Sequence, residues 1–435
     1  MRRFHSGDWP FFIVLGILTA FFLWGVRTIP FHPDESTQLY MSADFDTLFT
    51  NPLKLIFDPN AENDLKQHYR LIDAPLTRYL LGFGRTIGGF PALQADWDWS
   101  KTWDENVQIG ALPNEDLLYA GRMAIALLLP LSLVFIYLTG RQLGGRITGL
   151  SAVFFLGSSA LVLLHGRRAM AEGPLIFGVT FFLWSLFQGS RRPWLTGLAM
   201  AMAFNAKQST LALLPVGLLA VAWSPSQSPM DLKRIGANIA QYLGVFVLVT
   251  IALNPVFWNR PIRTLQIAVR ERQDLLERQL ADTQRVAPER ALDSPAERVV
   301  AVLANLYATP PMFYEIGNYV EETQSAEIEY LKLPGHDLLR GLAGGGIMLF
   351  ITLFGVAACL IGLRNENAGK RRPVILLMLA SAAQAGALLL AVPLPWQRYV
   401  IPLVPFAALW AGLGLANMVS AVAASWSALQ RQAER

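Results

Sequence analysis

Apolar residues in this chain are gathered in blocks of about twenty, and this grouping constrains its fold more than any other feature. About twenty apolar residues are what an α-helix needs to cross the hydrocarbon core of a bilayer. Ten such blocks occur, at residues 10–29, 119–140, 147–166, 173–189, 193–206, 208–224, 235–254, 341–363, 373–393 and 399–421. Only 16% of the 435 residues are charged, against about 25% in a soluble domain. The sequence therefore predicts an all-α, polytopic membrane protein with about ten transmembrane helices.

The basic residues between these blocks predict how the chain is oriented. The segments that share one side carry the following residues: Arg2, Arg3, Arg141, Arg146, Arg191, Arg192, Lys233, Arg234, Arg364, Lys370, Arg371 and Arg372. Such an excess of Lys and Arg marks the cytoplasmic side. The net charge of +4 thus reflects membrane topology, and no nucleic-acid partner is predicted.

Two long polar segments, residues 30–118 and 255–340, lie on the opposite side in this topology, and we expect the chemistry there. The remaining chain divides into a first span (1–29), a bundle (119–254), C-terminal spans (341–421) and a cytoplasmic tail (422–435). In the second long loop, a helical stripe of apolar residues between Leu265 and Leu280 predicts an amphipathic helix. Such a helix lies on a membrane, covers a cavity or packs against the bundle.

The fifth apolar block is too short to span a bilayer. Residues 193–206 form 14 residues, and at 1.5 Å per residue they reach only about 21 Å of a core of about 30 Å. Lys207 would then lie below the outer interface, where a charge is costly unless it faces a wet cavity or an anion. The alternative is that Lys207 extends its side chain outward to water.

Two adjacent carboxylates, Asp34 and Glu35, follow the first apolar block in the sequence His32-Pro33-Asp34-Glu35. A carboxylate at a membrane boundary can act as a general base, while its neighbour holds substrate or a divalent ion. The alternative is an ordinary helix start, with Pro33 in the first turn and two acidic residues complementing the helix dipole.

Several cations on the non-cytoplasmic side break the positive-inside pattern. They are Arg167, Arg168, Lys207 and Arg398, with Glu172 and Tyr399 beside them in sequence. Guanidinium groups bind phosphate oxygens bidentately and an ammonium adds a point charge, so this set suits a phosphate at the membrane interface. Contact with lipid headgroups is the alternative.

Eight short motifs, in this order and topology, resemble those of the GT-C glycosyltransferases. They are Phe31-His32-Pro33-Asp34-Glu35, Ile72-Asp73-Ala74-Pro75-Leu76, Gly121-Arg122, Arg141-Gln142-Leu143-Gly144-Gly145-Arg146, His165-Gly166-Arg167-Arg168, Phe204-Asn205-Ala206-Lys207, Asn254-Pro255-Val256-Phe257-Trp258 and Arg398-Tyr399-Val400-Ile401-Pro402-Leu403. The chain is most similar to the protein O-mannosyltransferase and aminoarabinose-transferase group. The resemblance covers residues 1–260 and about 393–415.

This resemblance implies an integral enzyme of the plasma or inner membrane. Such an enzyme transfers a sugar from a polyprenyl-phosphate carrier to a lipid, glycan or protein acceptor on the non-cytoplasmic side, generally with inversion. By position, Asp34 looks like the general base and Glu35 its partner. The donor phosphate would be held by Arg167, Arg168, Lys207 and Arg398, and substrate by His32, Asp73, Glu172 and Tyr399. The second long loop is too short for the large soluble domain of eukaryotic O-mannosyltransferases, which weakens the expectation of a protein acceptor.

Other function classes have less support. No phosphate-binding glycine loop and no His-Glu-x-x-His sequence is present, so nucleotide-driven and zinc-protease chemistry are disfavoured. No metal site is predicted, although a divalent cation is compatible with the acidic pair. A secondary transporter or flippase for a lipid carrier is the main alternative, and it is disfavoured because the two halves show no symmetry. A non-catalytic membrane partner subunit is the third hypothesis.

Overall fold

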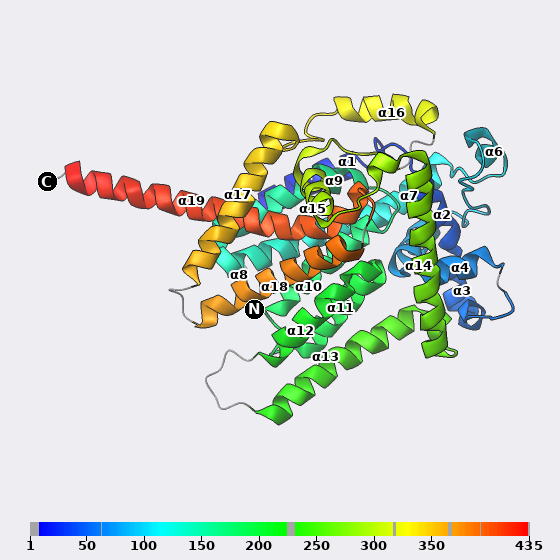
Figure 1. The fold of residues 1–435 in the computed structure, drawn as a ribbon, viewed down its shortest axis with the longest axis horizontal. Coiled ribbons are helices and arrows are strands. Elements are labelled where there is room, and N and C mark those ends of the chain that lie inside the picture. Colours follow the sequence, from blue (N-terminus) through cyan, green and yellow to red (C-terminus); the bar gives the residue numbers. More distant parts are fainter. Residues whose placement is uncertain are drawn as a thin grey trace.

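The structure is a computed structural model that describes residues 8–61, 63–223, 231–315, 319–363, 368–391 and 393–433. Within these ranges every regular element is a helix, which confirms the all-α prediction (Figure 1). The basic residues Arg2, Arg3 and Arg364 lie outside the described ranges.

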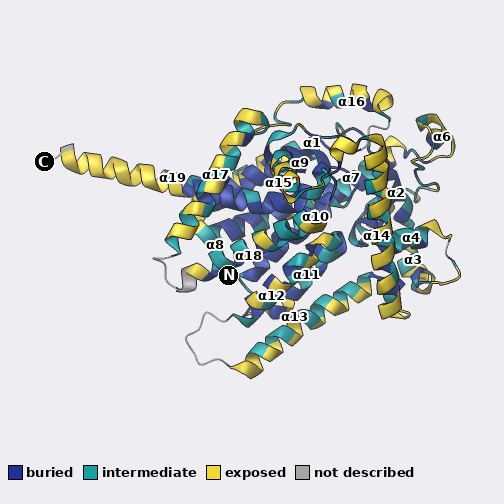
Figure 2. Ribbon diagram, in the orientation of Figure 1, coloured by how far each residue is buried: buried dark blue, intermediate teal, exposed yellow. Residues whose placement is uncertain are grey.

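A closely packed bundle forms the centre of the molecule. Its main helices are α1 (Trp9–Trp24), α8 (Leu128–Gly157), α9 (Ala160–His165), α10 (Glu172–Leu186), α11 (Pro193–Ala206) and α19 (Val404–Ala433). All described residues of α10 except Phe177 are buried, as expected for a helix that is apolar on every side. Figure 2 shows the buried residues concentrated in this bundle and exposed ones on the outer helices.

The predicted blocks 119–140 and 147–166 are joined by a turn inside α8. Gly145 has φ 89° and ψ −167°, a conformation that favours glycine. The two arms of α8 approach closely, because a Cβ atom added to Gly140 would lie 2.9 Å from the Gly149 Cα atom. The turn therefore falls within the basic motif Arg141–Arg146 that the sequence places on the cytoplasmic side.

The outer helices correspond to the remaining apolar blocks. They are α12 (Leu214–Ala222), α13 (Leu232–Leu253), α17 (Gly341–Gly362) and α18 (Ala368–Ala391). In the described part of the chain, five helical segments are long and apolar enough to cross a membrane, and three shorter apolar ones accompany them. The total of ten spans thus remains a prediction. Helix α19 continues through the predicted tail as far as Ala433 and projects from the bundle (Figure 1).

The two long loops are largely helical and lie together at one end of the bundle. The first contains α2 (Pro33–Met41), α3 (Ala43–Thr50), α4 (Leu65–Ile72), α5 (Leu76–Ile87) and α6 (Trp103–Gln108), followed by α7 (Glu115–Ala126). The second contains α14 (Pro261–Val286), α15 (Pro295–Leu303) and α16 (Val320–Lys332). Figure 1 shows α14 running across α4, and a 3.1 Å ion pair joins His68 to Glu271.

Helix α14 covers the stripe predicted to be amphipathic, but only part of that stripe is buried. Ala268 packs with Leu71 of α4 and with Val256, whereas Leu265 and Val269 are about half exposed, at 54% and 50%. The helix therefore packs on the first long loop and leaves apolar side chains on its outer face.

We expect Gly355→Ala to destabilise the contact between α17 and α19. A Cβ atom at Gly355 would overlap the carbonyl oxygen of Trp410, so the helices must separate. Overpacking of this kind costs about 1–3 kcal/mol. The thermal unfolding midpoint in detergent should fall relative to wild type, whereas Gly346→Ala, where the new methyl group meets open space, should leave it unchanged. Equal midpoints would contradict this packing.

Candidate functional site

The site begins at the first turn of α2, where His32 is the N-terminal cap. The Asp34 N–H donates to His32 Nδ1 at 3.1 Å, and the His32 N–H donates to Glu35 Oε2 at 3.0 Å. With Pro33 at the first helical position, this arrangement is a complete capping box. The motif is thus a helix start, and the cap directs the two acidic side chains to different surroundings.

Glu35 is fully buried between α2, α7 and the turn that precedes α10. Its carboxylate accepts two hydrogen bonds from Arg122, at 2.8 and 2.7 Å, and one from the Ala169 N–H at 2.8 Å. Burial alone would raise the pKa of Glu35, but the charge and hydrogen bonds of Arg122 outweigh it and hold the pKa below its ordinary value. With both oxygens occupied, Glu35 holds α2 in place and does not face an open site.

Asp34 keeps 26% of its side chain exposed and forms an ion pair with Arg398. Arg398 lies in the 3-10 helix η7 (Gln397–Leu403), 364 residues away in sequence. The Arg398 Nε atom also lies 3.1 Å from Glu315 Oε1 of the second long loop. One guanidinium group is therefore shared by two carboxylates.

Glu315 completes a network that includes His32. Its Oε2 atom lies 3.2 Å from His32 Nε2. Because His32 Nδ1 accepts a hydrogen bond from the Asp34 N–H, the ring proton belongs on Nε2, which then donates to Glu315. The helix cap and the ion-pair network are thus parts of one structure.

Electrostatics keep both of these carboxylates ionised. Burial alone would raise the pKa of Asp34, but the nearby Arg398 and His32 outweigh it and hold the pKa below the ordinary value of 3.8. Burial of Glu315 is likewise outweighed by Arg398 and by the hydrogen bond from His32, which hold its pKa well below its ordinary value. Asp34 is therefore ionised at neutral pH, which is the form that a general base requires.

The segment that carries Glu315 is fixed to the site by polar contacts. The buried amide of Gln397 accepts from the Met312 N–H at 2.8 Å and donates to the Pro310 carbonyl at 3.0 Å. The Tyr314 ring stacks on His32 at 5.3 Å. These contacts explain how a carboxylate from a distant loop reaches the first turn of α2.

Lys207 lies where α11 ends, as the sequence predicted from the shortness of that block. It is the C-terminal cap residue of a 14-residue helix, with extended backbone. Its Nζ atom lies 3.1 Å from Glu172 Oε1 and 5.7 Å from the centre of the Tyr399 ring. Since Tyr399 follows Arg398 directly, Lys207 borders the same site as Asp34.

Arg167 and Arg168 are buried and bind backbone carbonyls. Arg167 donates to Phe21 and Phe22, both at 2.9 Å, and so caps the end of α1. Arg168 donates to the Phe313 carbonyl at 3.0 Å, while its Nε atom has no partner among the described residues. Both arginines thus have structural contacts with backbone carbonyls, whereas Arg398 pairs with carboxylates and keeps 17% of its side chain exposed.

Asp73 lies at the edge of the site, after α4. It accepts a weak hydrogen bond from Gln38 Nε2 at 3.5 Å, and its backbone carbonyl accepts from Arg78 at 2.8 Å. Burial raises the pKa of Asp73, Arg272 and Arg78 partly offset this rise, and the Asp34 charge adds to it. Asp73 is therefore an electrostatic neighbour of Asp34.

Sequence reasoning gave no role to three residues of this arrangement, namely Arg122, Glu315 and His165. Arg122 carried a usable signal, because an arginine inside an apolar span requires a partner. Glu315 carried none, since a single carboxylate in a long loop is normally solvated. His165 is buried, and neither ring nitrogen has a partner among the described residues.

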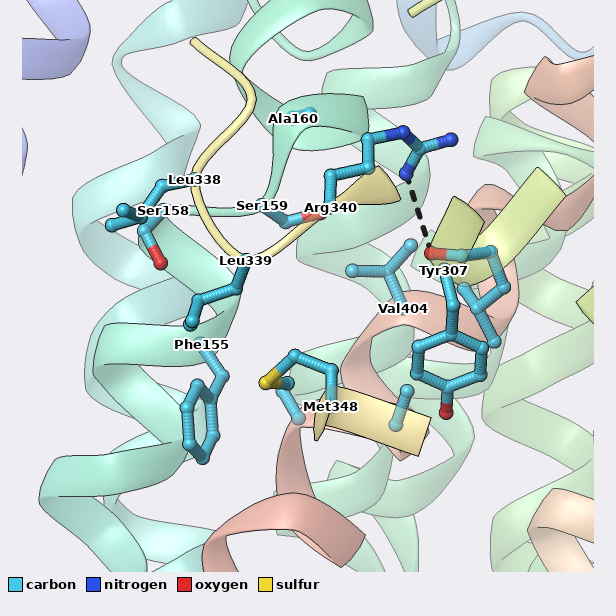
Figure 3. A pocket seen from close by; sticks show the side chains of 13 residues that line it. Phe155, Ser158, Ser159, Ala160, Tyr307, Leu338, Leu339, Arg340, Met348 and Val404 are labelled. Atoms are coloured by element: carbon cyan, nitrogen blue, oxygen red, sulfur yellow. Dashed lines mark hydrogen bonds between the residues drawn. The ribbon is translucent and has the colours of Figure 1, made fainter. Parts of the chain in front are cut away.

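A separate pocket lies away from these residues, between the bundle and the second long loop (Figure 3). It is lined by Phe155, Leu339 and Met348, and Arg340 borders it. The Arg340 guanidinium is directed at backbone carbonyls, including that of Asn305 at 2.7 Å. No group of three or more His, Cys, Asp or Glu side chains in the described ranges is arranged to hold a metal ion.

Comparison with known proteins confirms the resemblance to GT-C enzymes. Residues 68–265 match the family model of dolichyl-phosphate-mannose-protein mannosyltransferases. No curated protein matches the chain significantly. Two crystal structures share its fold with a TM-score of 0.51 and 13% sequence identity. One is the oligosaccharyltransferase of Archaeoglobus fulgidus without ligands, and the other is ArnT from Cupriavidus metallidurans bound to undecaprenyl phosphate.

These two matches establish the fold of the whole bundle. The archaeal match covers 98% of this chain and 52% of the oligosaccharyltransferase. The ArnT match covers 94% of this chain and 60% of ArnT. This chain thus spans about half the length of the archaeal enzyme.

Proposed function

We propose that this protein is a glycosyltransferase that moves a sugar from a polyprenyl-phosphate carrier to an acceptor. The observation that carries the proposal is an ionised, partly exposed Asp34 that is paired with Arg398, beside Lys207, where the two long loops meet. The match to the mannosyltransferase family model and the fold shared with ArnT, whose structure holds undecaprenyl phosphate, support this choice of donor.

The geometry supports an in-line displacement. Asp34 takes the proton from the acceptor hydroxyl or amide while the acceptor atom attacks the anomeric carbon. The bond between that carbon and the phosphate oxygen breaks, its electron pair stays on the phosphate, and the sugar configuration inverts. Arg398 and Lys207 stabilise the charge that develops on the departing phosphate. No nucleotide is needed, because the carrier sugar is already activated.

The remaining predicted residues take supporting roles in this proposal. Glu35 is a positioning residue that acts through Arg122, and His32 holds Asp34 by capping α2. Glu172 orients Lys207, and Tyr399 lies beneath the Lys207 ammonium group. Arg167 and Arg168 hold the end of α1 and the segment at Phe313 in place through their hydrogen bonds to backbone carbonyls. A divalent cation has no role in this proposal, because both Glu35 oxygens accept hydrogen bonds and Arg398 pairs with Asp34 and Glu315.

We further propose that the site faces the non-cytoplasmic side of the membrane. The turn at Gly145 places Arg141 and Arg146 at the end of the α8 arms, and the positive-inside rule assigns such residues to the cytoplasm. The loops that carry Asp34 and Glu315 would then lie opposite. Lipid, glycan and protein acceptors all fit this side.

The test of the proposal is consumption of a labelled polyprenyl-phosphate sugar by the purified protein in detergent, over a panel of acceptors. The wild type should release polyprenyl phosphate and label one acceptor class. If donor is neither bound nor consumed with any acceptor, the transporter and partner-subunit hypotheses take precedence.

Replacing Lys207 by Ala should weaken donor binding. The change removes the ammonium group that lies beside Glu172 and Tyr399, and a hydrogen bond to a charged group is worth about 1.5–3 kcal/mol. The KM for donor should rise about 10- to 100-fold. The KM of Lys207→Arg, which keeps the charge, should lie between those of wild type and Lys207→Ala. An unchanged KM in Lys207→Ala would contradict a role in donor binding.

A further inference from the structure

The shared use of Arg398 by two carboxylates raises a question about the donor phosphate. Asp34 occupies the Nη1 side of the guanidinium and Glu315 lies at Nε. Among the described residues, none accepts a hydrogen bond from Nη2. A phosphate that binds Arg398 through two nitrogens must therefore use Nη2 together with a nitrogen that a carboxylate already occupies.

Glu315 is the carboxylate that a phosphate can displace at lower cost. Asp34 is fixed in the first turn of α2 and must stay beside the acceptor to accept its proton. Only the Oε1 atom of Glu315 lies at Arg398, while its Oε2 atom lies 3.2 Å from His32 Nε2. A rotation of the side chain alone can therefore release the guanidinium and retain the hydrogen bond from His32. Displacement at Nε thus leaves both Asp34 and Glu315 with a partner.

The donor and the product differ in charge, and this difference explains how an exchange between Glu315 and phosphate at Arg398 helps the reaction. The donor is a phosphodiester with one negative charge, whereas polyprenyl phosphate is a monoester that carries about 1.5–2 negative charges at pH 7. A cationic site therefore binds the product more tightly than the donor. An anionic side chain that recaptures Arg398 opposes this difference and favours release of the product.

We propose that Glu315 competes with the phosphate for Arg398, so that it holds the guanidinium in the empty site, yields it to the donor, and recaptures it to expel polyprenyl phosphate. Glu315 is thus a positioning residue for Arg398 that governs product release. This inference rests on the proposed function, since it takes a polyprenyl phosphate as the anion.

The test measures binding of undecaprenyl phosphate to the purified full-length protein in detergent. Glu315→Gln removes the competing charge and should bind undecaprenyl phosphate about tenfold more tightly than wild type. In donor assays, the steady-state kcat of this variant should fall while its single-turnover rate stays near that of wild type, because only product release is slowed. A purely structural role for Glu315 would lower both rates.

Two further variants serve as controls. Glu315→Asp keeps the charge and should bind undecaprenyl phosphate within about threefold of wild type. Glu321→Gln removes one carboxylate from an exposed position in the same loop and should have no effect on binding. Folding of each variant is checked by its thermal unfolding midpoint. If Glu315→Gln fails to fold, Glu315→Ala, which also removes the charge, takes its place with the same expected result.

The possible outcomes separate this inference from the proposed function. If the wild type binds undecaprenyl phosphate and consumes donor, but Glu315→Gln binds it equally or more weakly, the competition is wrong and the proposed function stands. If Glu315→Asp, which keeps the charge, binds undecaprenyl phosphate about tenfold more tightly than wild type, the competition is also wrong. If the wild type neither binds undecaprenyl phosphate nor consumes donor, both proposals are overturned.

Discussion

Replacing Asp34 by Asn is expected to lower the rate of sugar transfer about 10²- to 10⁴-fold, the range that a general base contributes. The amide has nearly the same shape as the carboxylate, but it cannot accept the proton of the acceptor. Arg398 also loses one of its two anionic partners, so donor binding should be retained or strengthened. The measurement is single-turnover transfer from a labelled polyprenyl-phosphate sugar, with donor binding determined in parallel.

Asp73→Asn is the matched control for this variant, because Asp73 is an electrostatic neighbour of Asp34 that does not contact Arg398 directly. We expect its transfer rate to stay within about tenfold of wild type, since only a long-range charge is removed. Full activity of Asp34→Asn would exclude Asp34 as the base. Loss of donor binding in Asp34→Asn would instead indicate that Asp34 organises the donor site.

Replacing Arg122 by Met is expected to destabilise the protein by about 3–5 kcal/mol. This is the typical cost of removing one partner from a buried ion pair, because the remaining charge is left without compensation. Glu35 would keep only the hydrogen bonds from the backbone N–H groups of His32 and Ala169. The thermal unfolding midpoint in detergent should fall markedly, and sugar transfer should fall with it because α2 carries Asp34.

The double variant Glu35→Gln with Arg122→Met distinguishes charge from packing. It removes both charges, so we expect it to recover much of the stability lost in Arg122→Met alone. Its transfer rate should remain low, because α2 is no longer held by the pair. If the double variant is less stable than the sum of the single changes predicts, the ion pair is not the origin of the effect.

Taken together, these experiments separate the two adjacent carboxylates. Asp34→Asn should lower the chemical rate and leave stability nearly unchanged, whereas changes at the pair of Glu35 and Arg122 should act mainly through stability. If changes at Glu35 instead lower the chemical rate and Asp34→Asn lowers stability, Glu35 is the base and Asp34 is the structural residue. The helix cap at His32 is the physical reason for the difference, because it points one carboxylate toward Arg398 and the other into the bundle.

The sequence was sufficient for the features that depend on local composition. Blocks of apolar residues predicted an all-helical membrane protein, and the structure confirms the helical fold. The short block before Lys207 predicted where that helix ends, and α11 ends at Ala206. The motif at Pro33 and Asp34 was consistent with a helix start and with a base, and the capping geometry allows both at once. Such features follow from hydrophobic periodicity, helix length and capping, which are encoded within a few residues.

The contacts that define the site were decided only by the tertiary structure. Arg398 lies 364 residues from Asp34, and Glu315 reaches both His32 and Arg398 from the second long loop. The sequence singled out Arg398 as one of four unusual cations, but no local pattern pairs it with Asp34 or selects Glu315, because these residues meet only after the chain has folded. Arg122 signalled that it needs a partner, but only the fold shows that this partner is Glu35, with which it is buried as a pair. The sequence by itself thus indicated the apolar helices, their order and most residue types at the site. Long-range packing decided which charges meet, since the strength of an ion pair depends on distance and burial.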